Sequence, residues 1–96
     1  MTHLISQMNA VLSDWRERYD PFHQMSLSFQ QTDRGEVSLE QHRLRLAPGL
    51  VLREVRYDAK SILFAFDNNR TLEILLRWPE EETPYVDYIS WHYTTV

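Results

Sequence analysis

The 96-residue chain contains no cysteine. This absence excludes disulfide bonds, thiolate zinc sites, iron–sulfur clusters and cysteine nucleophiles. Because small secreted domains usually depend on disulfides, it also favours a cytoplasmic protein. The first residues have neither the basic start nor the long apolar stretch of a signal peptide. Apolar runs such as 62–66 are far shorter than the ~20 residues that cross a bilayer. We expect a cytoplasmic protein that does not contact membranes.

Glycine is almost absent as well, since the chain has only Gly35 and Gly49. Phosphate-binding loops and dinucleotide-binding fingerprints need several closely spaced glycines, and a nucleophile elbow needs two around its serine. No pair of carboxylates is placed by a motif for acid–base chemistry, and the histidines lack the spacing of metal ligands. We predict no enzymatic activity, no cofactor and no metal site. The histidines are His3, His23, His42 and His92.

The chain also lacks a strong excess of either charge. Its 10 basic and 14 acidic residues give a net charge of −4, and Lys60 is the only lysine among the basic residues. A small acidic protein of this kind does not strongly attract nucleic acid or anionic lipid. The preference for arginine fits either codon bias or a surface that uses the guanidinium group for bidentate pairing.

The residues that are present describe an ordinary globular chain. Hydrophobic residues make up 43% and charged residues 25% of the sequence, and the length predicts a single domain over residues 1–96. Apolar residues at spacings of three and four predict an amphipathic helix over residues 2–19. The helix should end at Asp20-Pro21, because the residue before a proline disfavours the α conformation. The apolar stripe consists of Leu4, Ile5, Met8, Val11, Leu12, Trp15 and Tyr19.

After Pro21 the apolar period changes from 3.6 to 2, which is typical of strands with one polar face. Turns are predicted at residues 32–35, at Pro48-Gly49 and at Asn68-Asn69, where asparagine tolerates the left-handed conformation of a tight hairpin. The apolar parity changes near residues 40–42, which indicates a bulge or a break there. The predicted strands are about 23–31, 36–46, 50–57, 61–66, 71–78 and 85–95.

The links between these strands are short, and short links join antiparallel neighbours. The predicted fold is therefore α+β, with one N-terminal amphipathic helix packed on a curved antiparallel meander of five to six strands. A helix is ~10–12 Å across and six strands span roughly 25–29 Å. The later strands also carry apolar residues on both faces, so the sheet either curls strongly or packs against another chain.

The aromatic last strand and the acidic loop before it are the first candidates for such a contact. Tyrosine and tryptophan contribute contact energy at a low cost in side-chain entropy. Simple alternation places Tyr85 with Ile89, Trp91 and Tyr93, on the face opposite to Val86 and Tyr88. The candidate partner-binding residues are Tyr85, Tyr88, Trp91, Tyr93, Glu80, Glu81 and Glu82.

These patterns favour a protein-binding module that contacts another protein, a second copy of itself, or both. An inhibitor, an immunity or anti-defence protein of bacterial or phage origin, or a secretion-type chaperone would have these features. A nucleic-acid-binding sheet is the first alternative, because arginines and aromatic residues can form a stacking platform. The net charge and the interleaved acids Glu36, Glu40, Glu54 and Glu73 disfavour it, since they should pair the arginines across strands. The second alternative is a small enzyme or ligand-binding fold with a pocket between helix and sheet. The arginines are Arg43, Arg45, Arg53, Arg56, Arg70 and Arg77.

Overall fold

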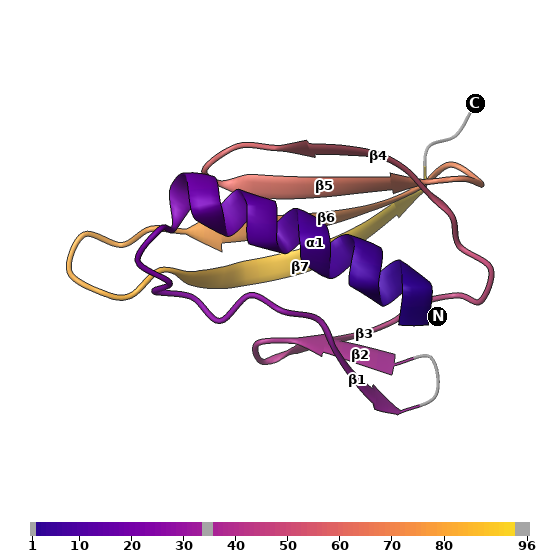
Figure 1. Cartoon of the computed structure of the whole chain (residues 1–96), viewed down its shortest axis with the longest axis horizontal. Coiled ribbons are helices and arrows are strands. Elements are labelled where there is room, and N and C mark those ends of the chain that lie inside the picture. Colours follow the sequence, from indigo (N-terminus) through magenta and orange to yellow (C-terminus); the bar gives the residue numbers. More distant parts are fainter. Residues whose placement is uncertain (1, 34–35, 94–96) are drawn as a thin grey trace. The chain divides into compact units, whose positions relative to one another are not determined.

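The computed structural model describes residues 2–33 and 36–93 (Figure 1). One N-terminal helix is followed by seven strands in two antiparallel sheets, ordered β1-β2-β3 and β4-β5-β6-β7. This confirms the predicted α+β class. The chain divides into two compact units, Met1–Leu50 and Val51–Val96, which we call the first and the second unit; the single domain stays a prediction. The elements are α1 (Thr2–Tyr19), β1 (Gln30–Asp33), β2 (Glu36–Leu39), β3 (His42–Arg45), β4 (Leu52–Tyr57), β5 (Ser61–Phe66), β6 (Arg70–Arg77) and β7 (Tyr85–Tyr93).

Helix α1 of the first unit has the bounds and the apolar stripe that the sequence predicts. Met8, Leu12 and Trp15 are completely buried, and the Trp15 and Tyr19 rings lie 5.7 Å apart. Arg16 and Arg18 lie in the last turn, where positive charge is favourable. Among the described residues, no helix is long and apolar enough to cross a membrane.

The predicted strand over residues 23–31 is largely wrong, because only Gln30 and Gln31 of this range lie in a sheet. Met25, Leu27 and Phe29 are buried in alternation, as in a strand. Side chains, however, bind part of the backbone in this segment. Gln24 and Met25 donate their backbone N–H groups to the Asp20 carboxylate, and Phe29 exchanges two hydrogen bonds with the Asn9 side chain.

The predicted strand over residues 36–46 is two strands, β2 and β3, joined by a two-residue turn. The pair Leu39 and His42 closes this hairpin, and Glu40 takes a φ of 54°. The change of apolar parity near residues 40–42 therefore marks a turn rather than a bulge within one strand. Arg34 and Gly35 of the predicted 32–35 turn lie outside the described residues.

The prediction of a single meander is also wrong, because the seven strands form two sheets that divide between β3 and β4. Residues 46–51 link the two sheets. Pro48 has no backbone N–H for a ladder, and Gly49 takes a φ of 80° that favours glycine over other residues. The predicted turn at Pro48-Gly49 is therefore confirmed, and strand pairing begins again only at Leu52.

The four strands of the second unit follow the sequence closely. Strand β5 has the predicted bounds, and β6 lies one residue earlier than predicted. Asn68 and Asn69 have φ values of 64° and 59°, which confirms the left-handed hairpin turn between β5 and β6. The predicted last strand reaches residue 95, but residues 94–96 lie outside the described part of the chain.

Candidate protein-binding face

The sheet of the second unit has two different faces. Cross-strand partners project from the same face of a sheet, and the register places Ile62 beside Ile74 and Phe64 beside Leu72 on a buried face. The other face carries apolar and polar side chains together, and we call it the mixed face. Its members are Glu54, Arg56, Ser61, Leu63, Ala65, Thr71, Glu73, Leu75, Arg77, Tyr85, Tyr88, Ser90 and His92.

A β-bulge in β7 determines which aromatic residues share the mixed face. The register shifts between Leu75, which pairs with Tyr88, and Leu76, which pairs with Val86. A bulge inserts one extra residue and reverses the alternation beyond it. Tyr85 therefore lies on the same face as Tyr88, contrary to the alternation predicted from the sequence. Asp87 is the extra residue of the bulge.

The candidate aromatic residues consequently separate into two groups. Tyr85 and Tyr88 are 39% and 48% exposed, and both belong to the mixed face. Trp91 pairs with Leu72 on the buried face, and its ring lies 5.8 Å from that of Phe66. The side chain of Tyr93 lies outside the described residues. The exposed aromatic pair is therefore Tyr85 and Tyr88, without Trp91.

One end of the mixed face contains a hollow of about 390 Å³. This volume falls within the range of ligand pockets, roughly 300–1,000 Å³. It is large enough to accept a side chain from a partner. The lining residues are Lys60, Leu75, Leu76, Arg77, Trp78, Asp87 and Tyr88.

Hydrogen bonds fix two walls of the hollow. The Trp78 indole N–H donates to the Ala59 carbonyl oxygen at 2.6 Å, and the Leu76 backbone N–H donates to the Lys60 carbonyl oxygen at 2.8 Å. These bonds hold the end of β6 against the turn between β4 and β5. The Trp78 indole is therefore held in one orientation by the chain itself.

Two acids and two bases lie at or next to the hollow, and one acid and one base of these form an ion pair. Arg77 Nη2 donates to Asp87 Oδ2 at 3.1 Å, and this hydrogen bond raises the pKa of Arg77. The Asp58 carboxylate accepts the Lys60 and Ser61 backbone N–H groups. The bond from Lys60 is the largest cause that lowers the pKa of Asp58, and the Lys60 charge adds to the effect. The Asp58 carboxylate therefore stays ionised at neutral pH.

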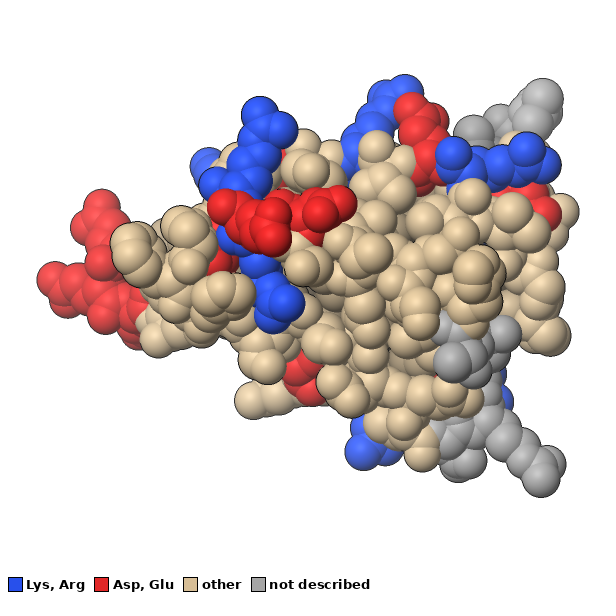
Figure 2. Space-filling view, in the orientation of Figure 1, with Lys and Arg blue, Asp and Glu red and all other residues tan. Residues whose placement is uncertain are grey.

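The acidic loop joins β6 to β7 directly beside the hollow. It spans residues 79–84, and Glu80, Glu81 and Glu82 are exposed. Acidic side chains gather where Figure 1 draws this loop (Figure 2). Within residues 2–33 and 36–93, none of the three glutamates has an ion-pair partner. They therefore form the uncompensated negative charge at this end of the sheet.

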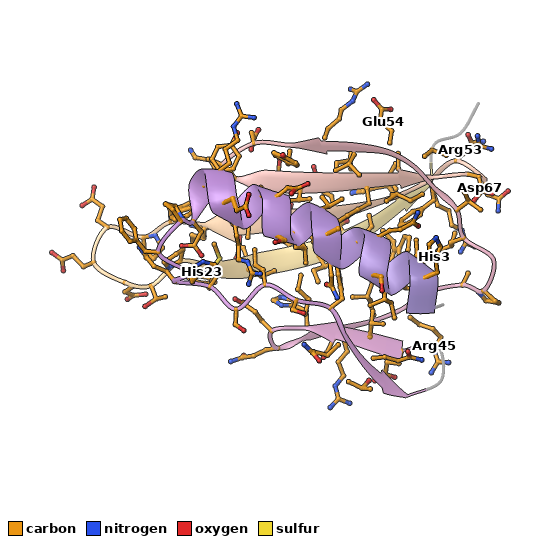
Figure 3. The ribbon with its side chains drawn as sticks, viewed as in Figure 1. His3, His23, Arg45, Arg53, Glu54 and Asp67 are labelled. Atoms are coloured by element: carbon orange, nitrogen blue, oxygen red, sulfur yellow. The ribbon has the colours of Figure 1, made fainter. Side chains whose placement is uncertain are left out.

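The other end of the second unit is held by a carboxylate as well. Asp67 Oδ1 accepts the Val51 backbone N–H at 3.1 Å, and the Asp67 N–H donates to the Val51 carbonyl oxygen at 3.0 Å. Arg53 and Asp67 lie near this end of the sheet (Figure 3). These contacts bind the first residue of the unit, Val51, to the β5–β6 turn. This turn lies at the end of β5 and β6 that is opposite to the hollow.

The remaining candidate chemistry is dispersed. His3 and His23 lie at opposite ends of α1 (Figure 3), and His92 Nε2 lies 3.9 Å from Glu73 Oε1. Among the described residues, no group of three or more His, Cys, Asp or Glu is placed to hold a metal ion.

The predicted pairing of arginines with acids across strands is confirmed for Glu36. Glu36 pairs across strands with Arg43 and Arg45 at 3.5 and 3.8 Å, whereas Glu54 pairs with Arg56 two residues along the same strand. Glu73 faces His92 rather than an arginine. Arg43, Arg45, Arg56 and Arg77 thus each have a carboxylate within 4 Å, and their side chains remain largely exposed.

Six residues that line the hollow were not among the candidate partner-binding residues: Lys60, Leu75, Leu76, Arg77, Trp78 and Asp87. Trp78 and Tyr85 flank the two prolines that bracket the acidic loop, and this symmetry was a usable signal. No feature of the sequence indicated the bulge at Asp87. No protein-family model matches the chain, and neither a curated protein nor a solved structure is significantly similar to it.

Proposed function

We propose that the chain is a non-enzymatic protein-binding module that contacts its partner through the mixed face, at the end that contains the hollow. The observation that carries this proposal is the hollow itself, bordered by the exposed Tyr88 ring and the fixed Trp78 indole. Aromatic residues beside a pocket are the usual centres of binding energy in protein interfaces. The proposal keeps the Tyr85 and Tyr88 of the sequence-based hypothesis and places Trp91 outside the contact.

The composition of the mixed face supports the same proposal. Leu63, Ala65 and Leu75 form the half-buried apolar part of this face. Glu73 lies opposite Leu63, and other ionisable side chains of the face include Arg56, Arg77 and His92. Protein interfaces commonly combine an apolar centre with a polar rim. A sheet face that met only water would need no such apolar side chains.

The nucleic-acid alternative has less support in the contacts of the described residues. Arg43, Arg45, Arg56 and Arg77 each form an ion pair with a carboxylate. The neighbouring carboxylates offset the positive charge that would attract phosphate, and nucleic-acid-binding sheets need a net basic face.

A display library of random short peptides tests the proposal, because it offers the mixed face many different partner sequences at once. Peptides enriched on the wild-type protein are measured against Tyr88→Ala and against Phe22→Ala. Phe22 is the matched control because it is an aromatic residue of the first unit that is 83% exposed. We expect Tyr88→Ala to weaken binding by about thirtyfold, as a central aromatic contact does, while Phe22→Ala leaves it unchanged.

The variants must be folded for this comparison to count, which amide spectra by NMR establish. Tyr88 is half exposed, so its truncation should leave the fold intact. The proposal is wrong if no peptide is enriched, or if the enriched peptides bind folded Tyr88→Ala as tightly as the wild type.

A further inference from the structure

The charge balance around the hollow indicates what kind of protein segment would enter it. Arg77 and Asp87 neutralise each other at 3.1 Å, and Lys60 lies in the turn whose backbone N–H groups bind the Asp58 carboxylate. The formal charges of these two acids and two bases sum to zero. The side chains left to receive a partner are then the apolar and aromatic ones, Leu75, Trp78 and Tyr88.

The surplus charge of the region lies in the acidic loop. The second unit contains five basic and eight acidic residues, a net charge of −3. The three glutamates of the loop equal this excess. The loop begins at Pro79, the residue after Trp78 of the hollow, so its charges are held beside the hollow by the chain itself. A partner that fills the hollow therefore meets a negative surface.

We infer that the hollow takes one apolar or aromatic side chain from a basic segment of another protein, whose flanking lysine or arginine side chains lie against Glu80, Glu81 and Glu82. This inference rests on the proposed function and specifies the chemistry of the partner. Opposite charges at the rim of an interface speed association and exclude partners of the wrong sign. A second copy of the chain would bring the same acidic loop to the contact, and the two loops would repel each other.

The composition of the enriched peptides is the first readout. We expect one Leu, Ile, Phe, Tyr or Trp beside two or more Lys or Arg, well above their frequency in the unselected library. Tyr88-dependent peptides that are acidic or neutral would overturn this inference and leave the proposed function standing. The absence of any Tyr88-dependent peptide would instead overturn the proposed function itself.

The second readout uses one synthetic peptide from the enriched basic set. The triple variant Glu80→Gln, Glu81→Gln and Glu82→Gln should weaken its binding by about tenfold at low ionic strength, and by much less at high salt, because salt screens exposed charges. The matched control, Asp14→Asn, Glu17→Gln and Glu40→Gln, removes three charges from the first unit and should leave binding almost unchanged. An equal loss in both triple variants would overturn the inference, since it would show an effect of net charge alone.

Sedimentation equilibrium decides whether a second copy occupies the face. We expect a monomer at the concentrations used for peptide binding. A wild-type dimer that Tyr88→Ala converts to a monomer would overturn the inference, because the chain itself would then fill the hollow.

Discussion

The backbone is hydrogen-bonded in different ways in the two units. In the first unit, the extended segment after α1 binds side chains, those of Asn9 and Asp20, through its backbone groups. In the second unit, four strands bind one another through backbone ladders, with register shifts between Leu52 and Glu54 and between Leu75 and Leu76. The segment after α1 therefore depends on a few polar side chains, whereas the second unit binds its backbone mainly from strand to strand.

Two aspartates show the same contrast at close range. Asp20 and Asp58 each accept two backbone N–H groups from a turn that follows them. Asp20 is only 1% exposed, whereas Asp58 lies at the surface. Water can replace the bonds of an exposed carboxylate but not those of a buried one. The hydrogen bonds of Asp20 should therefore contribute more to the free energy of unfolding than the similar bonds of Asp58.

The largest expected effects come from the buried aromatic side chains of each unit. Trp15→Ala and Phe64→Ala each remove a completely buried ring, and each should lower the free energy of unfolding by about 3–5 kcal/mol. Urea unfolding followed by circular dichroism measures this loss. Because each unit has about fifty residues, near the lower limit for independent folding, we expect one cooperative transition.

Amide hydrogen exchange tests this cooperativity unit by unit. Each substitution should accelerate exchange in α1 and in β6 alike. Milder variants, Trp15→Phe and Phe64→Leu, provide the same comparison if the alanine variants do not fold. Exchange that changes in only one unit would contradict the predicted single domain and make the two units separate folding units.

The next effect comes from the buried carboxylate. Asp20→Ala leaves two backbone N–H groups without their acceptor, which should lower the free energy of unfolding by about 2–3 kcal/mol. Asp58→Ala is the matched control and should cost less than about 1 kcal/mol, because water reaches its turn. Thermal or urea unfolding of both variants measures the difference. Equal losses in the two variants would show that the burial of a carboxylate does not determine how much its hydrogen bonds contribute to stability.

The sequence predicted elements whose backbone pattern follows from their own residues. Helix α1 was predicted with its bounds, because its stripe and Asp20-Pro21 are local signals. Strand β5 and the Asn68-Asn69 turn were predicted for the same reason. The segment 23–31 was not, because its alternation is that of a strand while its hydrogen-bond acceptors include Asp20 and Asn9. Asn9 lies twenty residues before Phe29, and hydrogen bonds to individual side chains leave no periodic signal in the sequence.

The candidate site was predicted only in part, and the bulge explains why. Alternation from Tyr85 to Trp91 assumes two residues per repeat, and one extra residue at Asp87 reverses it. Tyr85 therefore joined Tyr88 instead of Trp91. The hollow also depends on Lys60 and Trp78, which come from different turns and strand ends. Only their arrangement in space brings them together.

A smaller effect on the free energy of unfolding is expected from substitutions in the two hairpin turns. The β2–β3 turn holds Glu40 at a φ of 54°, whereas the β5–β6 turn uses Asn68 and Asn69 at similar angles. Asparagine tolerates this conformation better than glutamate does. Glu40→Gly should therefore raise the free energy of unfolding by about 0.5–1 kcal/mol, and Asn68→Gly should change it less. Urea unfolding of both variants tests the difference, and a larger gain at Asn68 would contradict it.

The smallest effect is the acid dependence that Asp58 contributes. Backbone hydrogen bonds from Lys60 and Ser61 lower its pKa below the ordinary value of 3.8 in the folded chain. A carboxyl group whose pKa is lower in the folded state stabilises the fold above its unfolded pKa, and this contribution is lost as the pH falls through the folded pKa.

The Asp58 carboxyl carbon, followed by NMR through an acid titration, should therefore show a midpoint below 3.8. Ser61→Ala removes the hydroxyl that donates to Asp58 Oδ1 at 3.3 Å and should move the midpoint upward. A midpoint at or above the ordinary value would mean that the hydrogen bonds from Lys60 and Ser61 do not favour the carboxylate.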